Sequence, residues 1–123
     1  MVRIFYGGKS IVLKGFVDTG NNLCEPFSGS PVAMAPLEEI KKILPEDMYL
    51  LMEKEDLSTD KRLKTIVCKT VSGTVLKKAF RPERFEVKNE DGDFVAEDIL
   101  VAASDMIFEK TVIFGKNVLL KRI

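Results

Sequence analysis

Short apolar runs, each ended by a turn signal, recur along this 123-residue chain and constrain its fold more than any other feature. Gly7-Gly8 stands between two β-rich runs, and a glycine pair there is typical of a two-residue hairpin turn. Ser72-Gly73 predicts a second hairpin in the same way. Strands are predicted in the following runs: 2–6, 11–17, 31–35, 65–71, 74–76, 85–88, 99–103 and 111–114. The chain is therefore expected to be all-β.

Two segments depart from this strand pattern. The apolar residues of segment 36–44 fall on one helical face until Pro45 ends the pattern, and the charged segment 46–60 allows a second short helix. After Gly115 the chain fits either a short helix or a final strand. Many short strands with one or two small helices favour a single, compact, barrel-like β domain over residues 1–123.

Composition excludes several classes of function. Lys plus Arg and Asp plus Glu are equal at 19 each, so no net positive field draws the chain to nucleic acid. No apolar run approaches the roughly 20 residues of a membrane-spanning helix. The sequence has no His and only two Cys, which excludes Ser-His-Asp and Cys-His catalysis and an ordinary zinc site. Any catalysis is therefore expected to depend on carboxylates, without a metal or a cofactor.

The segment GFVDTGNNL presents a carboxylate at the end of a predicted strand, where Asp18 is followed by Thr19 and Gly20. Two interpretations are open. In the first, Asp18 is a turn residue that leaves the strand. In the second, it is half of a catalytic pair, in which two carboxylates share one proton about a water molecule that attacks a peptide. In that pair the N–H of Gly20 approaches the carboxylate, and the Thr19 hydroxyl bonds to a partner loop.

Three segments extend the pattern: GFVDTGNNLCEPFSGSPVAMAP, KTIVCKTVSGTVLKKAFRPERFEV and VIFGKNVLL. Together they resemble the protease domain of the bacterial sporulation sigma-E factor-processing peptidases, which are retropepsin-like aspartic peptidases. The resemblance implies a retropepsin-like acid protease barrel with one lobe per chain. It makes Asp18 the catalytic residue, supported by Thr19 and Gly20. A flap is expected over the substrate, and the residues predicted to form it or to contact substrate are Lys69, Val71, Ser72 and Gly73.

The sequence contains one D-T-G and no D-S-G, so a single chain supplies half a site. The resemblance accordingly implies a homodimer in which Asp18 meets its symmetry mate. Chain ends form part of the dimer sheet in such enzymes, and segments 3–5 and 119–123 are the candidates here.

The resemblance also names the expected partners and location. The substrate is a sigma factor precursor, which loses its pro-segment in the mother cell of a sporulating bacterium, and the family allows for an activating partner. Membrane attachment is expected only through an N-terminal region that is absent from this chain, with the present domain facing the cytoplasm. A different class of function stays open: a catalytically silent retropepsin-like module for dimerisation or scaffolding. The two classes differ in whether cleavage requires Asp18.

Overall fold

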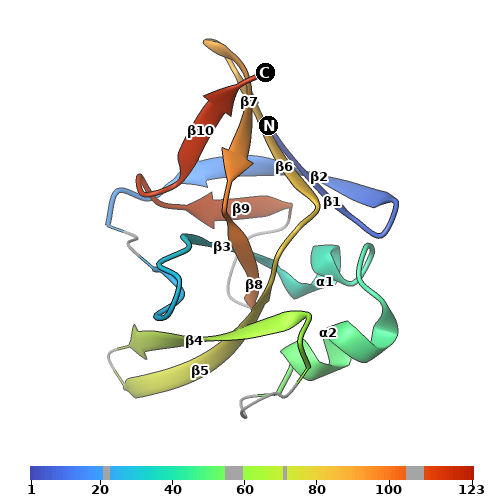
Figure 1. The fold of residues 1–123 in the computed structure, drawn as a ribbon, viewed down its shortest axis with the longest axis vertical. Helices are drawn as coiled ribbons and strands as arrows, with labels where there is room; N and C mark the ends of the chain where they lie inside the picture. The colour runs from blue at the N-terminus through green and yellow to red at the C-terminus, as the bar shows by residue number, and fades with distance from the viewer. Residues whose placement is uncertain (21–22, 55–59, 71, 105–109) are drawn as a thin grey trace.

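The computed structural model of the protein describes residues 1–20, 23–54, 60–70, 72–104 and 110–123. These residues form mostly strands, with two short helices (Figure 1). In chain order the elements are β1 (Val2–Tyr6), β2 (Lys9–Val17), β3 (Val32–Pro36), α1 (Leu37–Ile40), α2 (Glu46–Met52), β4 (Leu63–Thr70), β5 (Gly73–Phe80), β6 (Arg84–Asn89), β7 (Gly92–Glu97), β8 (Leu100–Ser104), β9 (Thr111–Phe114) and β10 (Leu119–Arg122). The expectation of an all-β fold is confirmed.

The strands form one hydrogen-bonded sheet in the order β10-β7-β6-β1-β2-β9-β3-β8-β5-β4. The long strand β2 joins the two halves of this sheet, because Lys9–Leu13 pair with β1 and Lys14–Val17 pair in parallel with β9. Strands β3 and β8 are also parallel. Among the described strands, β10 and β4 are the two edges and do not pair with each other. The expected barrel is therefore an open sheet, not closed by hydrogen bonds.

The N-terminal hairpin forms as the sequence predicts. Gly7 and Gly8 have φ angles of 58° and 78°, the left-handed values that a two-residue hairpin turn requires at both central positions. Ile4 lies opposite Ile11 in the register, and both side chains are buried. Because side chains alternate along a strand, the inward face of β2 continues to Leu13.

The main core anchors the strand that runs beside the end of β2. Val112 and Phe114 of β9 are buried, and the Phe114 ring meets Phe85 edge-to-face at a centroid distance of 6.0 Å. Such aromatic contacts add about 0.5–1.5 kcal/mol to the burial of the rings. The other large, fully buried apolar side chains are Ile4, Leu13, Ile40, Met48, Ile66, Phe80, Leu100, Val2, Val32 and Val101. The position of β9 is thus fixed by the core.

The helical segments are shorter than the sequence pattern suggests. Helix α1 ends at Ile40, and Pro36 belongs to β3 with an extended ψ of 133°. Ile43 and Leu44 are nevertheless buried, because the turn after α1 keeps the same apolar face toward the core. Helix α2 confirms the second helix predicted in segment 46–60. Neither helix in the described ranges has the length and hydropathy needed to cross a bilayer.

Two strands near the C-terminus refine the sequence interpretation. Strand β7 is absent from the strand prediction because polar residues surround it and, of its side chains, only that of Ala96 is buried. Strand β10 resolves the choice after Gly115 in favour of a strand, and it pairs with β7.

Candidate active site

Asp18 lies immediately after β2, where the strand leaves its pairing with β9. The backbone N–H of Asp18 donates to the carbonyl oxygen of Phe114 at 2.9 Å, one step beyond the last strand pair, Val17 with Phe114. The loop that carries the carboxylate therefore begins at a fixed backbone position. Its support is the buried strand β9 and not a flexible linker.

The Asp18 carboxylate is oriented by its own loop. Oδ1 accepts a hydrogen bond from the backbone N–H of Gly20 at 3.0 Å, which confirms the contact expected from the sequence. Asp18, Thr19 and Gly20 are all exposed. Within the described ranges Oδ2 has no hydrogen-bond partner, and residues 21 and 22, which follow the motif, lie outside these ranges.

Within the described ranges Gly20 and Thr19 have few contacts. A Cβ added at Gly20 would meet Oδ1 of Asp18 at 3.5 Å, which is an ordinary van der Waals distance, and no other described atom within 4 Å. The Thr19 hydroxyl makes no hydrogen bond in the described part of the chain.

The predicted flap is the β4–β5 hairpin. The two strands stay paired from Leu63 with Phe80 to Thr70 with Gly73, and Ser72 and Gly73 are exposed at the turn. Val71 lies outside the described residues, and only the backbone of Lys69 is described. In the described part of the chain, Asp18 makes hydrogen bonds to backbone groups of Gly20 and Phe114 and none to the hairpin.

The loop of residues 23–31, which follows the motif, lies between the end of β2 and the turn of the β4–β5 hairpin (Figure 1). In Figure 1 the end of β2, the loop of residues 23–31 and the turn of the β4–β5 hairpin lie on the same side of the molecule. The two ends of this loop are held together. Cys24 and Pro31 form an isolated antiparallel β-bridge, and the N–H of Val32 donates to the carbonyl of Leu23 at 3.0 Å. The side chain of Asn117 donates to the same carbonyl at 3.4 Å.

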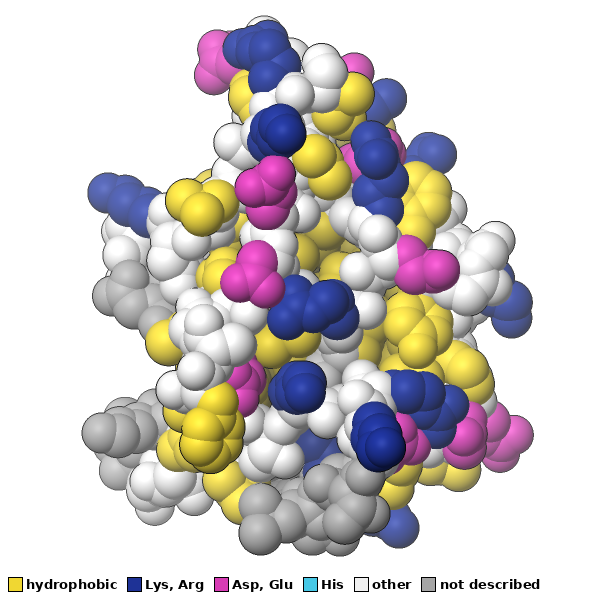
Figure 2. Space-filling model, in the orientation of Figure 1, with side chains coloured by type: hydrophobic (Ala, Val, Ile, Leu, Met, Phe, Trp, Pro, Cys, Tyr) yellow, Lys and Arg dark blue, Asp and Glu magenta, His cyan; other side chains and the backbone are white. Residues whose placement is uncertain are grey.

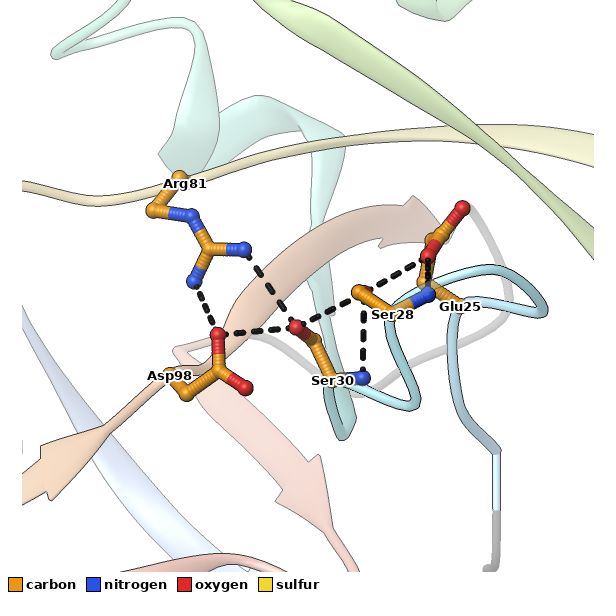
Figure 3. Close-up of polar contacts among 5 residues, drawn as sticks. All are labelled: Glu25, Ser28, Ser30, Arg81 and Asp98. Carbon is orange, nitrogen blue, oxygen red and sulfur yellow. Dashed lines mark hydrogen bonds and ion pairs between the residues drawn. The ribbon is translucent and has the colours of Figure 1, made fainter.

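A polar network inside this loop was missed by sequence reasoning (Figure 3). Glu25 is only 5% exposed, and its Oε2 accepts hydrogen bonds from the N–H of Phe27 at 3.1 Å, the N–H of Ser28 at 2.6 Å and the Ser28 hydroxyl at 2.6 Å. These donors, first the Ser28 hydroxyl and next the Ser28 N–H, hold the pKa of Glu25 below its ordinary value. Glu25 is therefore an ionised group that fixes the turn.

The network continues from the loop to two distant segments. The hydroxyl oxygens of Ser28 and Ser30 lie 2.9 Å apart, and the Ser30 hydroxyl donates to Asp98 Oδ1 at 2.8 Å. Arg81, which follows β5, pairs with the same Asp98 oxygen at 2.8 Å. The only local sequence signal for this network was Glu25 followed three residues later by Ser28. Its other members, Arg81 and Asp98, are far from the loop in the sequence.

The fold and this loop define a class: a mainly β domain that presents an Asp-Thr-Gly motif at the end of a core-anchored strand. The sequence profile of the peptidase family described as Sporulation factor SpoIIGA matches residues 1–114, and the chain belongs to this family. It is also 34% identical over 50 residues to the Sporulation sigma-E factor-processing peptidase of Priestia megaterium (strain ATCC 12872 / QMB1551). That match covers 41% of this chain and 16% of the relative. No solved structure matches the chain.

Proposed function

We propose that this chain is the aspartic endopeptidase domain of a longer sigma-E factor-processing peptidase, with Asp18 as its catalytic carboxylate. The observation that carries the proposal is the position of Asp18-Thr19-Gly20 at the end of β2, inside a peptidase-family match over residues 1–114. The sequence position of Asp18 would equally suit an aspartate that only forms the turn after the strand. An exposed carboxylate whose backbone N–H is bound to Phe114 and whose Oδ1 accepts from Gly20 is a suitable group for peptide hydrolysis.

The reaction requires a second carboxylate. One ionised carboxylate takes a proton from the attacking water, and a protonated one donates a proton to the carbonyl oxygen of the scissile peptide, which becomes a tetrahedral diol. Because the sequence contains one such motif, the second Asp18 comes from another copy of the chain in a two-fold dimer. The two Asp18 carboxyl groups share one proton, because two negative charges a few ångström apart repel each other and the groups do not both ionise.

Three features near the motif support a partner surface. Phe16 and Val17 are 57% and 50% exposed, although they are large apolar residues at the end of the strand that leads directly to Asp18. In the described part of the chain the Thr19 hydroxyl has no hydrogen-bond partner, and a Cβ at Gly20 would meet only Oδ1 of Asp18. A second copy packed against this end of β2 would cover the apolar pair and use both groups.

The shared dimer sheet would form through β10. Strand β1 lies between β2 and β6, so both of its edges are occupied and segment 3–5 does not fit the role considered for it from the sequence. Strand β10 is an edge strand; Leu119 at its start is 68% exposed, and Ile123 directly after it is 63% exposed. An exposed, apolar edge strand is a surface that another chain can extend.

The biological reaction proposed is removal of the pro-segment from a sigma factor precursor in the mother cell. The support is the family and the name of the Priestia megaterium relative, of which the aligned part is 16%. The rest of such a protein would supply the membrane attachment, with residues 1–123 forming the peptidase domain on the cytoplasmic side.

The test is precursor cleavage by the full-length protein carrying Asp18→Asn. Cleavage should be abolished, while the circular dichroism spectrum and the sedimentation coefficient of the protein stay unchanged. Asp91→Asn is the matched control, because Asp91 is also an exposed aspartate in a turn and lies outside the motif. Cleavage that persists in Asp18→Asn contradicts the proposal, and a wild-type protein that assembles but never cleaves supports the scaffold alternative.

A further inference from the structure

A groove of about 750 Å³ lies between the loop of residues 23–31 and the start of β4. One wall contains Glu25, Phe27 and Ser28, the other contains Leu63–Thr65, and Arg81 closes the end. The ionised Glu25 attracts Lys64 of the opposite wall, so the charges across the groove are balanced. Figure 2 likewise shows acidic and basic side chains interspersed over one face of the molecule. What the groove offers a ligand is therefore its shape and not an excess of one charge.

The loop wall is rigid within itself. The Glu25 carboxylate binds the N–H groups of Phe27 and Ser28, and the N–H of Ser30 donates to Ser28 Oγ at 3.2 Å. The N–H of Glu25 donates to the carbonyl of Ser30 at 2.9 Å, which closes the base of the turn. Because the turn keeps its own shape, the width of the groove depends on how the turn is joined to the rest of the sheet.

The side chain of Ser30 makes that join. Ser30 is fully buried, and its hydroxyl donates to Asp98 Oδ1 at 2.8 Å and accepts from Arg81 Nη2 at 3.3 Å (Figure 3). Within the described ranges, the side-chain hydrogen bonds that lead out of residues 24–30 are these two. Arg81 directly follows β5, the strand that pairs with β4. The two walls of the groove are therefore connected through one hydroxyl group.

Asp98 holds the other side of this join. It lies between β7 and β8 in a left-handed conformation, with a φ of 53°, and its Oδ1 also accepts from Arg81 Nη1 at 2.8 Å. Aspartate adopts this conformation more readily than most residues do. An exposed ion pair contributes little by itself, but here the pair binds a buried hydroxyl from a third segment. The contact thus fixes the relative positions of three separate parts of the chain.

We infer that Ser30 is a positioning residue for substrate binding: its hydroxyl holds the loop wall at a fixed distance from β4, so the groove is already formed when an extended segment of the precursor enters. The inference rests on the proposed peptidase function. A preformed site binds more tightly because binding does not have to order the wall. The ends of the loop are held separately, since the N–H of Val32 in β3 donates to the carbonyl of Leu23. Ser30 therefore acts on substrate binding and not on the chemistry at Asp18.

The experiment measures KM and kcat for precursor cleavage by the full-length wild type and by Ser30→Ala. We expect KM to rise about five- to tenfold, because one hydrogen bond to a charged pair is lost, and kcat to stay within about twofold. A serine needed only for folding would lower the amount of active protein, and hence the apparent kcat, without a change in KM. Ser10→Ala is the matched control, since Ser10 is an exposed strand serine that does not line the groove, and both of its constants should equal those of the wild type.

Asp98→Gly tests the same join while the buried serine stays in place. Glycine adopts a φ of 53° freely, so this variant removes the carboxylate without straining the backbone. It should raise KM as Ser30→Ala does, and the double variant should raise KM no further than the larger single effect. A wild-type KM in both single variants, or single effects that multiply in the double variant, overturns the role of Ser30 alone. Failure of the wild type to cleave the native precursor overturns the peptidase function instead.

Discussion

Gly15 lies in β2, the strand that leads to Asp18, at a point where the core has no space for a side chain, and its substitution gives a sharp test of the packing. A Cβ built on Gly15 lies 2.8 Å from Cγ2 of Val2 and 3.4 Å from Cε1 of Phe114. Val2 is 1% exposed and Phe114 is 4% exposed, so neither side chain has solvent to move into. Gly15→Ala therefore overpacks the core beside the strand that carries Asp18.

The magnitude follows from two opposing terms. Overpacking of a filled core costs about 1–3 kcal/mol, and the loss of glycine flexibility in the unfolded chain returns about 0.4–1 kcal/mol. We expect Gly15→Ala to lower the free energy of unfolding by about 1–2 kcal/mol. Val2→Ala removes two buried methyl groups and should cost about 2 kcal/mol by itself.

The double variant Gly15→Ala/Val2→Ala tests whether the close contact with Val2 is what destabilises Gly15→Ala. With Val2→Ala present, the atom that the new methyl group meets is gone, and the methyl group fills part of the cavity. Urea denaturation should show the double variant to be less destabilised than the sum of the two single variants by about 1 kcal/mol or more. Additivity within about 0.3 kcal/mol refutes the packing argument.

Two further predictions concern ionised groups. Because hydrogen bonds lower the pKa of folded Glu25 beneath its ordinary 4.5, its contribution to stability is present above that pH and is lost as the pH falls through the folded value. The stability difference between wild type and Glu25→Gln, measured in urea at successive pH values, should therefore shrink in acid; a constant difference contradicts the assignment. The side-chain hydrogen bond from Arg62 lowers the pKa of Asp60 to about 2. In an NMR titration, Arg62→Gln should move that midpoint up toward 3.8, and an unchanged midpoint excludes Arg62 as the cause.

Local sequence signals predicted the features that depend on adjacent residues. The hairpin at Gly7-Gly8 follows from two positive φ angles that glycine adopts freely, and Asp18 lies at a strand end because the β-rich run 11–17 is followed directly by Asp-Thr-Gly, which signals a turn. The family resemblance, which rested on motifs quoted from nearly the whole chain, agrees with the match over residues 1–114.

Features that depend on distant residues were not predictable in the same way. The parallel pairing of β2 with β9 joins segments about a hundred residues apart, and no local pattern encodes it. The Glu25 network requires Arg81 and Asp98, whose charges on their own are typical of any exposed surface. Strand β7 was missed because its side chains are mostly outside the core, so hydrophobic periodicity carries little signal there.

The central claim is that each active site requires one Asp18 from each of two chains. Its most direct test is precursor cleavage by mixed dimers, in which wild-type and Asp18→Asn full-length chains are co-expressed at equal levels and purified together. If a dimer with one carboxylate is inactive, random pairing leaves about one quarter of the activity of the same total amount of wild-type protein. Activity of about one half would mean that each chain holds a complete site, and would contradict the claim.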